Sequence, residues 1–185
     1  MTAVAKIAVI DDSTLMHGLD WSGQDLAGWW ISEKLHGCRA YWDGRAMWTR
    51  NGNQVRIPEA WRAWLPMIDL DGELWAGVYG YTEARLATQY GRFSPAVKFM
   101  VFDANLPGDF LDRQATLHNA LVANPCAFKV SHRLVPSTAD ALAQLRAVRA
   151  QGGEGIIARH PANVYRAGRT NEILKLKGQL VRIDA

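Results

Sequence analysis

Short apolar segments of strand length, separated by turns that contain glycine, dominate the chain from Trp29 onward. Residues 38–42 and 45–50 flank Asp43-Gly44, a dipeptide that favours a tight β-hairpin. Asn51-Gly52 supplies a second turn signal directly afterwards. Because hairpins join neighbouring antiparallel strands, the pattern favours sheets that are built mainly from antiparallel pairs.

Helical patterns alternate with these strands. The clearest helix is predicted over 137–151, where apolar residues recur at helical spacing, Ser137 or Thr138 can cap the start, and a glycine pair ends it. Together the elements indicate an α+β fold, with antiparallel sheets flanked by helices. The other predictions are helices over 58–64, 82–90 with Thr82 as N-cap, and 112–123, strands over 29–33, 68–75, 97–103, 155–159 and 172–177, and irregular or edge structure over 1–28.

The composition is that of one folded domain. The chain has 185 residues, of which 49% are hydrophobic and 21% are charged, which argues against general disorder. No stretch approaches the length of a membrane helix, and the N-terminus lacks a signal-peptide cleavage pattern, so we expect a cytoplasmic protein without membrane association. Two cysteines, Cys38 and Cys126, are too few for a disulfide framework, and the histidines lack zinc-ligand spacing.

The net charge of +3 is concentrated near the C-terminal end. Residues 159–185 contain six Lys or Arg residues, the last of them Arg182, against only Glu172 and Asp184. A basic segment of this kind can hold a polyanion, although an ordinary solvated basic surface has the same composition.

Lys34 lies between a predicted strand and a glycine turn, and Arg39 follows shortly after it. A lysine amine becomes a nucleophile only when it is deprotonated, and a neighbouring cation favours that form. Gly37 would let the backbone approach a ligand closely. The segment therefore suits a nucleophile, and it suits equally well a hairpin corner with Lys34 and Arg39 in solvent.

Four later segments place charged or aromatic residues at turns and strand ends. Asp71-Gly72-Glu73 brings acids into an apolar strand, Phe102 comes near the end of another, and Glu154 stands in a glycine turn. Lys175 and Lys177 alternate with leucines, so both ammonium groups point to the same face of a strand, where they repel unless an anion or water lies between them. Taken singly, each segment is also explained by turn chemistry, core packing or a solvated edge strand.

Together and in this order, these segments resemble the covalent nucleotidyltransferases, a superfamily of ATP-dependent DNA ligases, RNA ligases and mRNA capping enzymes. The family's first motif, Lys-x-Asp-Gly-x-Arg, is similar to Lys34-Leu35-His36-Gly37-Cys38-Arg39. The sequence around the motifs is most similar to small bacterial and phage-type ATP-dependent DNA ligases, over roughly residues 15–178. The later motifs are matched by Arg50, Asp71-Gly72-Glu73, Phe102, Glu154 and Lys175-Leu176-Lys177.

The resemblance implies a single adenylation domain over residues 1–185, without the OB-fold domain that usually follows it. It implies that Lys34 attacks the α-phosphate of ATP and becomes a lysyl-AMP phosphoramidate. Lys175 and Lys177 would be both catalytic and nucleotide-binding, because they hold that phosphate.

The remaining matched residues are implied to bind the nucleotide and a metal ion. Arg39 and Glu73 would hold the ribose end, Arg50 would add a further cation, and Phe102 would stack on the adenine. Glu154, together with Glu73, would bind Mg²⁺ or Mn²⁺, since carboxylates suit a hard cation that keeps several waters.

Two positions depart from the family pattern. His36 stands where the family has aspartate, so a ring that is neutral or cationic near pH 7 replaces a carboxylate. The change would slow the reaction, favour the reactive amine, or be tolerated at a turn. Ser32 stands where many relatives carry an acidic residue that reads the adenine amino group, so a preference for ATP over GTP rests on similarity alone.

The function implied is that of a minimal ATP-dependent DNA ligase, which seals nicks between a 5′-phosphate and a 3′-hydroxyl through lysyl-AMP and DNA-adenylate. The expected partners are ATP and nicked double-stranded DNA, and we expect a monomer. One alternative is an RNA ligase of the same superfamily. Another is a degenerate module that binds nucleotide or nicked DNA without joining it, which His36 and the missing OB-fold domain favour. A plain α+β protein would carry the motifs by accident.

Overall fold

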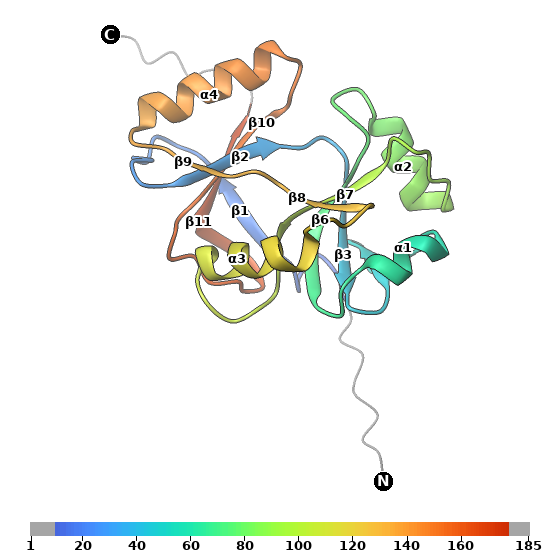
Figure 1. Cartoon of the computed structure of the whole chain (residues 1–185). Helices are drawn as coiled ribbons and strands as arrows, with labels where there is room; N and C mark the ends of the chain where they lie inside the picture. Colours follow the sequence, from blue (N-terminus) through green and yellow to red (C-terminus); the bar gives the residue numbers. More distant parts are fainter. Residues whose placement is uncertain (1–9, 178–185) are drawn as a thin grey trace.

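The computed structural model describes residues 10–177 and contains two β-sheets with four helices packed on them (Figure 1). The sequence expectations for the N-terminal leader and for Arg182 and Asp184 lie outside the described residues. Helix α4 lies against one sheet, whereas α1 and α2 lie beside the other. The candidate site lies where the two sheets meet.

Sheet A has five strands, of which the interior ones are antiparallel. Helix α4 (Thr138–Ala150) covers its outer face, where Leu145, Leu174 and Leu176 belong to one buried cluster. Because side chains alternate along a strand, Lys175 and Lys177 point to the opposite face. The strand order is β1 (Met16–Asp20), β11 (Gly168–Lys177), β10 (Gly155–Arg159), β2 (Trp30–Lys34) and β9 (Arg133–Leu134).

Sheet B has six strands and carries the larger core, which includes the buried residues Trp42, Leu70 and Phe99. Its helices are α1 (Glu59–Trp64), α2 (Tyr81–Tyr90) and α3 (Phe110–Leu121). The strand order is β5 (Gln54–Val55), β4 (Met47–Thr49), β3 (Cys38–Asp43), β6 (Asp69–Trp75), β7 (Lys98–Asp103) and β8 (Ala127–Lys129).

The predicted α+β fold with antiparallel sheets is confirmed, with two differences at the edges. Strand β1, within the segment expected to be irregular or edge structure, pairs in parallel with β11, and β8 pairs in parallel with β7. Both are edge strands, so the sheet interiors keep the antiparallel pairing that the hairpin signals predicted.

The helix starts differ from the predictions by one or two residues. Helix α2 begins at Tyr81, with Gly80 rather than Thr82 at its N-cap position. Helix α3 begins at Phe110 because Asp109 and Asp112 form a capping box, in which each side chain accepts from the other's backbone N–H. Ser137 caps α4, as the sequence allowed.

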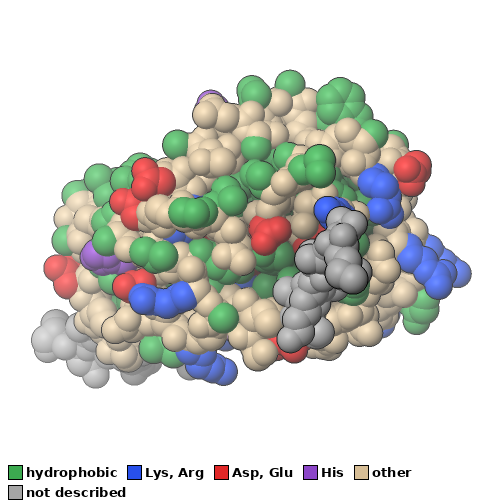
Figure 2. All heavy atoms as spheres, turned by 90° about the horizontal axis from the view of Figure 1, so that it is seen from below, with side chains coloured by type: hydrophobic (Ala, Val, Ile, Leu, Met, Phe, Trp, Pro, Cys, Tyr) green, Lys and Arg blue, Asp and Glu red, His purple; other side chains and the backbone are tan. Residues whose placement is uncertain are grey.

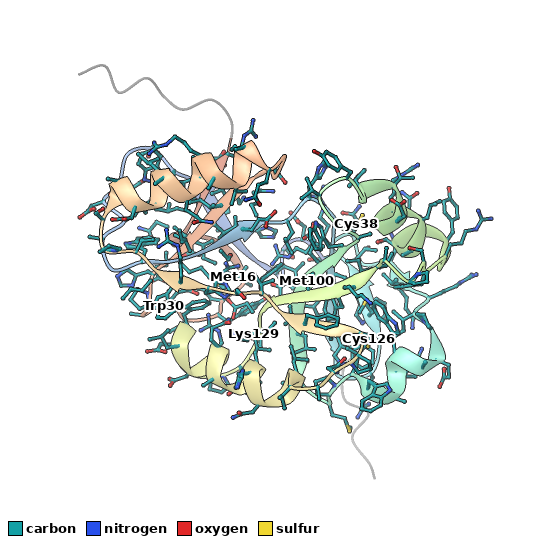
Figure 3. All side chains as sticks on the ribbon, turned by 45° about the horizontal axis from the view of Figure 1, so that its top comes forward. Met16, Trp30, Cys38, Met100, Cys126 and Lys129 are labelled. Carbon is teal, nitrogen blue, oxygen red and sulfur yellow. The ribbon has the colours of Figure 1, made fainter. Side chains whose placement is uncertain are left out.

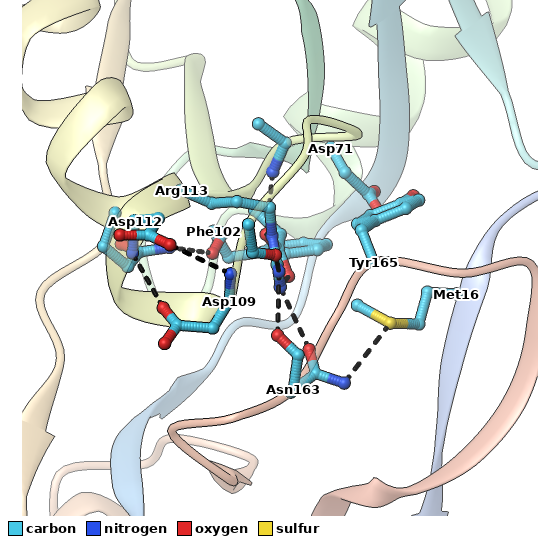
Figure 4. A network of polar contacts seen from close by, with 12 residues as sticks. Met16, Asp71, Phe102, Asp109, Asp112, Arg113, Asn163 and Tyr165 are labelled. Carbon is cyan, nitrogen blue, oxygen red and sulfur yellow. Dashed lines mark hydrogen bonds and ion pairs between the residues drawn. The ribbon is translucent and has the colours of Figure 1, made fainter.

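A buried guanidinium fastens α3 to the rest of the fold (Figure 4). Arg113 is fully buried, and all five of its N–H donors are used. Two go to the Asp103 carboxylate at 2.7 and 3.1 Å, two to Asn163, and one to the Gly108 carbonyl oxygen. Arg113 therefore joins α3 to strand β7 and to the connection between β10 and β11.

Three further features concern the helices, the cysteines and the junction of the two halves within residues 10–177. None of the four helices there has the length and apolar character needed to cross a bilayer. Cys38 and Cys126 are both free thiols. Figure 3 places Met16 and Met100 near the junction of the two halves, with Trp30 and Cys126 on either side of it.

Candidate active site between the two sheets

A cavity of about 330 Å³ lies where the two sheets meet. Strands β1, β2, β10 and β11 line it from sheet A, and β3, β6 and β7 line it from sheet B. Strand alternation explains its polar character, because one face of each strand packs into a core and the other faces the cavity. Seven of the eight predicted site residues line it, namely Lys34, Arg39, Arg50, Glu73, Phe102, Lys175 and Lys177.

The eighth residue, Glu154, is joined to the cavity through Lys34. The Nζ atom of Lys34 lies 2.5 Å from Oε1 of Glu154. In the sheet register, Gly155 pairs with Lys34 on one side and with Lys177 on the other. A Cβ at Gly155 would lie 2.1 Å from the Leu176 carbonyl oxygen, so only glycine fits between the two lysine-bearing strands.

The two C-terminal lysines give this end of the cavity its positive charge. Burial lowers the pKa of Lys175, and the charges of Lys177 and Lys34 lower it further, while Asp20 opposes them. Lys177 reaches Asp20 only at 3.6 Å. Cations gathered in this way are stabilised by a bound anion, which suits a phosphate group.

Arg39 is fixed by a buried carboxylate that the sequence analysis did not assign to the site. Its Nε and Nη2 atoms donate to the two oxygens of Asp71 at 2.9 and 2.6 Å, and Asp71 is only 1% exposed. Burial alone would lower the pKa of Arg39, but the Asp71 carboxylate raises it above the usual value. Arg39 therefore stays cationic at the cavity wall.

Glu73 on β6 lies next to the turn that follows Lys34. The Gly37 N–H donates to its Oε1 at 3.0 Å, and a Cβ at Gly37 would lie 2.2 Å from the Leu74 carbonyl oxygen. The glycine of the first motif is thus required by this close approach of backbone to strand β6. Burial raises the pKa of Glu73 to about 7, against the opposing effects of the Gly37 N–H, Lys34 and Arg39.

Arg159 is a site residue that the sequence analysis missed. It is 4% exposed, lines the cavity, and lies with its guanidinium carbon 5.2 Å from the ring centroid of Phe102. Among the described residues it forms no ion pair, its Nε has no partner, and its closest hydrogen bond is to Ser32 at 3.5 Å. In the sequence, Arg159 stands as a charged residue at the end of a buried strand, two positions after Ile157 and therefore on the same face.

The two departures from the family pattern lie in different places. Ser32 lines the cavity beside Arg159. His36 does not line it, and its ring instead stacks on Tyr81 of α2, with centroids 4.8 Å apart.

A metal ion at this site would depend largely on the substrate for its ligands. Across residues 10–177, no three His, Cys, Asp or Glu side chains gather closely enough to hold one. The carboxylates at hand, Glu154 and Glu73, fit an ion that is bound by one or two carboxylates together with water and phosphate oxygens.

Comparison with solved structures places this arrangement in a known family. The chain superimposes with a TM-score of 0.76 on a Lig E DNA ligase whose structure was solved in work on DNA binding with a minimal scaffold. The two are 32% identical, over 88% of this chain and 69% of the other. The chain belongs to the DNA ligase family.

Membership of the DNA ligase family is also apparent in sequence. The DNA ligase of Haemophilus influenzae is 31% identical over 171 residues, which are 90% of this chain and 63% of that ligase. The chain thus spans less than two thirds of this relative's length. The structure of a Chlorella virus DNA ligase-adenylate has the same fold, with a TM-score of 0.75 at 18% identity over 90% of this chain and 67% of the viral one. No family model matches the sequence.

Proposed function

We propose that this chain is an ATP-dependent DNA ligase that carries AMP on Lys34. The observation that carries the proposal is the place of the Lys34 amine, which pairs with Glu154 and lines the same cavity as Lys175 and Lys177. Membership of the DNA ligase family supports it. Residues 10–177 would act as the adenylation domain.

In the first step the Lys34 nitrogen attacks the α-phosphorus of ATP. A P–N bond forms, the P–O bond to pyrophosphate breaks, and the ammonium proton must leave before attack. Glu154 holds the amine in place and, at 2.5 Å, is positioned to take that proton. An oxygen of the DNA 5′-phosphate then displaces Lys34 from AMP, and the 3′-hydroxyl finally displaces AMP to form the phosphodiester.

The cavity walls would neutralise and orient the nucleotide. Lys175 and Lys177 lie on the face where the phosphates would bind, and transfer of this kind depends mainly on positioning and charge stabilisation. Arg39, Arg50 and Glu73 would bind the nucleotide, and Phe102 would stack on the base. The buried Arg159 beside Phe102, which forms no ion pair within residues 10–177, would contact the same end of the ligand.

A divalent ion, Mg²⁺ or Mn²⁺, would be held by Glu154, by Glu73 and by the phosphates. When bound, it would neutralise charge on the phosphates as pyrophosphate leaves.

The nucleic-acid partner proposed is nicked double-stranded DNA, bound by a monomer. Figure 2 shows one face of the molecule, on which acidic and basic side chains are interspersed among apolar ones. DNA bound on this face would make a limited number of Lys and Arg contacts to phosphate. DNA affinity should therefore be modest and should fall with rising salt.

The test is incubation with labelled ATP followed by nicked duplex, with adenylylated protein, adenylylated DNA and sealed product scored separately. The proposal predicts all three for DNA, with less sealing of a nicked RNA duplex. For the Lys34→Ala variant, the matched control is Lys98→Ala, since Lys98 lies over Phe128, outside the cavity. Nucleotide binding without any adduct would support the degenerate module, and preferential sealing of RNA would support an RNA ligase.

A further inference from the structure

Tyr165 is a buried hydroxyl group that no motif of the sequence marked, yet it contacts the carboxylate that holds Arg39. It lies in the connection between β10 and β11, and it is 8% exposed. Its hydroxyl donates to Oδ2 of Asp71 at 2.7 Å, and the two side chains lie together in Figure 4. The same oxygen accepts from Nη2 of Arg39 at 2.6 Å. Tyr165 and Arg39 therefore share one acceptor atom.

Within residues 10–177, the hydrogen bonds of Arg39 leave a single N–H donor unused. Of the five donors of a guanidinium, two go to Asp71 and one goes to the Met16 carbonyl oxygen at 2.7 Å. A fourth faces Nδ1 of His17 at 3.3 Å. The other His17 nitrogen lies 2.8 Å from the Asp12 carbonyl oxygen and donates to it, so in the neutral ring Nδ1 is the acceptor. One Nη1–H thus remains for a ligand in the cavity.

The direction of that last donor depends on the orientation of the Asp71 carboxylate. The terminal torsion of an aspartate has a broad energy minimum, so the carboxylate plane is set by its hydrogen bonds. Arg39 itself supplies two of these bonds, and Tyr165 supplies the bond that comes from outside the pair. The Tyr165 segment is itself anchored, because Arg113 binds Asn163 two residues earlier.

We propose that Tyr165 is a positioning residue, which orients Arg39 for nucleotide binding through Asp71. The inference rests on the proposed function, in which Arg39 binds the nucleotide and Lys34 reacts with it. Because Arg39 does not hold the reacting phosphate, loss of the Tyr165 hydroxyl should weaken nucleotide binding and leave the chemical step largely intact.

Tyr41 provides a matched control from the same cluster of buried side chains. Its hydroxyl donates to Asp69 at 2.8 Å, two residues before Asp71 on β6, and Tyr41 is 2% exposed. Asp69 forms no ion pair with an arginine among the described residues, and it does not line the cavity. Tyr41→Phe and Tyr165→Phe therefore each remove one tyrosine–aspartate hydrogen bond, which is part-buried for Tyr41 and buried for Tyr165, and only the second leads to Arg39.

The test measures the rate of lysyl-AMP formation against ATP concentration, together with AMP affinity by calorimetry and the melting temperature. Tyr165→Phe should raise the half-saturating ATP concentration and the AMP dissociation constant about five- to tenfold, with the maximal rate within about twofold. Asp71→Asn should shift both constants in the same direction, and Tyr41→Phe should shift neither. In an Arg39→Lys background, Tyr165→Phe should add less than about twofold.

Equal nucleotide constants for Tyr165→Phe and Tyr41→Phe would overturn the inference. So would a fall in melting temperature for Tyr165→Phe that far exceeds the fall for Tyr41→Phe, because that result indicates a structural role. If the unaltered chain forms no lysyl-AMP at all, the proposed function fails, and AMP affinity still decides whether Tyr165 acts through Arg39.

Discussion

The amine of Lys34 and the carboxylate of Glu154 form an ion pair of 2.5 Å, although the two residues come from opposite ends of the chain. Strands β2 and β10 are neighbours in sheet A, and Gly155 directly opposite Lys34 brings the pair together. The pair fixes where the proposed nucleophile lies before any nucleotide arrives.

Replacing Glu154 by glutamine should slow lysyl-AMP formation about 10²- to 10⁴-fold, because the amine loses its partner and its proton acceptor. The measurement is the rate of adduct formation at saturating ATP. Glu59→Gln serves as control, since the Glu59–Arg62 pair of 3.5 Å is exposed and lies outside the cavity. Equal rates for the two variants would exclude a role for Glu154 in the first step.

Glu73 should make the free energy of unfolding depend on pH. Burial raises its pKa to about 7 from the ordinary 4.5, so between these values the folded chain keeps a proton that the unfolded chain has lost. Stability should therefore fall as pH rises through this window, by up to about 3 kcal/mol. Glu73→Gln should remove most of that fall.

Urea unfolding at pH 5 and pH 8, without metal or nucleotide, measures the effect of Glu73. The glutamine variant should gain stability relative to the unaltered chain at pH 8 and gain little at pH 5. A difference that is the same at both pH values would show that the Glu73 carboxyl does not titrate in this range.

Arg113 should be one of the residues on which folding depends most. Replacing it with methionine leaves the buried Asp103 carboxylate without its ion-pair partner, which should cost about 3–5 kcal/mol of unfolding free energy. Arg62→Met is the control, because exposed pairs contribute about 0–1 kcal/mol. Similar urea midpoints for the two variants would mean that the Arg113 network is not structural.

Phe102→Ala should weaken ATP binding and still allow the lysyl adduct to form at high ATP. Stacking of a base on an aromatic ring is worth about 1–3 kcal/mol, which corresponds to roughly 5- to 150-fold in half-saturating ATP. Phe128→Ala is the matched control, since Phe128 also has a cation, Lys98, over its ring but lies outside the cavity. An unchanged ATP dependence in Phe102→Ala would remove the ring from the nucleotide site.

The sequence predicted the elements whose signals are local. The Asp43-Gly44 hairpin, the capped helix α4 and the alternation of Lys175 with Lys177 each depend on neighbours a few residues apart, and all appear in the structure. The order of the motifs then identified the family, because several short patterns had to occur together in the same order along the chain.

What the sequence did not predict depends on partners far apart in the chain. Strand β1 pairs with residues that follow it by about 150 positions, and such a parallel pairing leaves no turn signal. The bond from Tyr165 to Asp71 spans 94 residues. Arg159 looked like an ordinary strand end until the fold placed its guanidinium against Phe102. The capping box of Asp109 and Asp112, by contrast, was readable as an Asp-x-x-Asp pattern.

The most direct test is the intact mass of the protein after incubation with ATP and Mg²⁺, for the unaltered chain and for Lys34→Ala. We expect a mass increase of one AMP on the unaltered chain, lost on addition of nicked DNA, and no increase for Lys34→Ala. The same AMP adduct on the Lys34→Ala protein, or none on the unaltered chain, would contradict the assignment of Lys34 as the nucleophile.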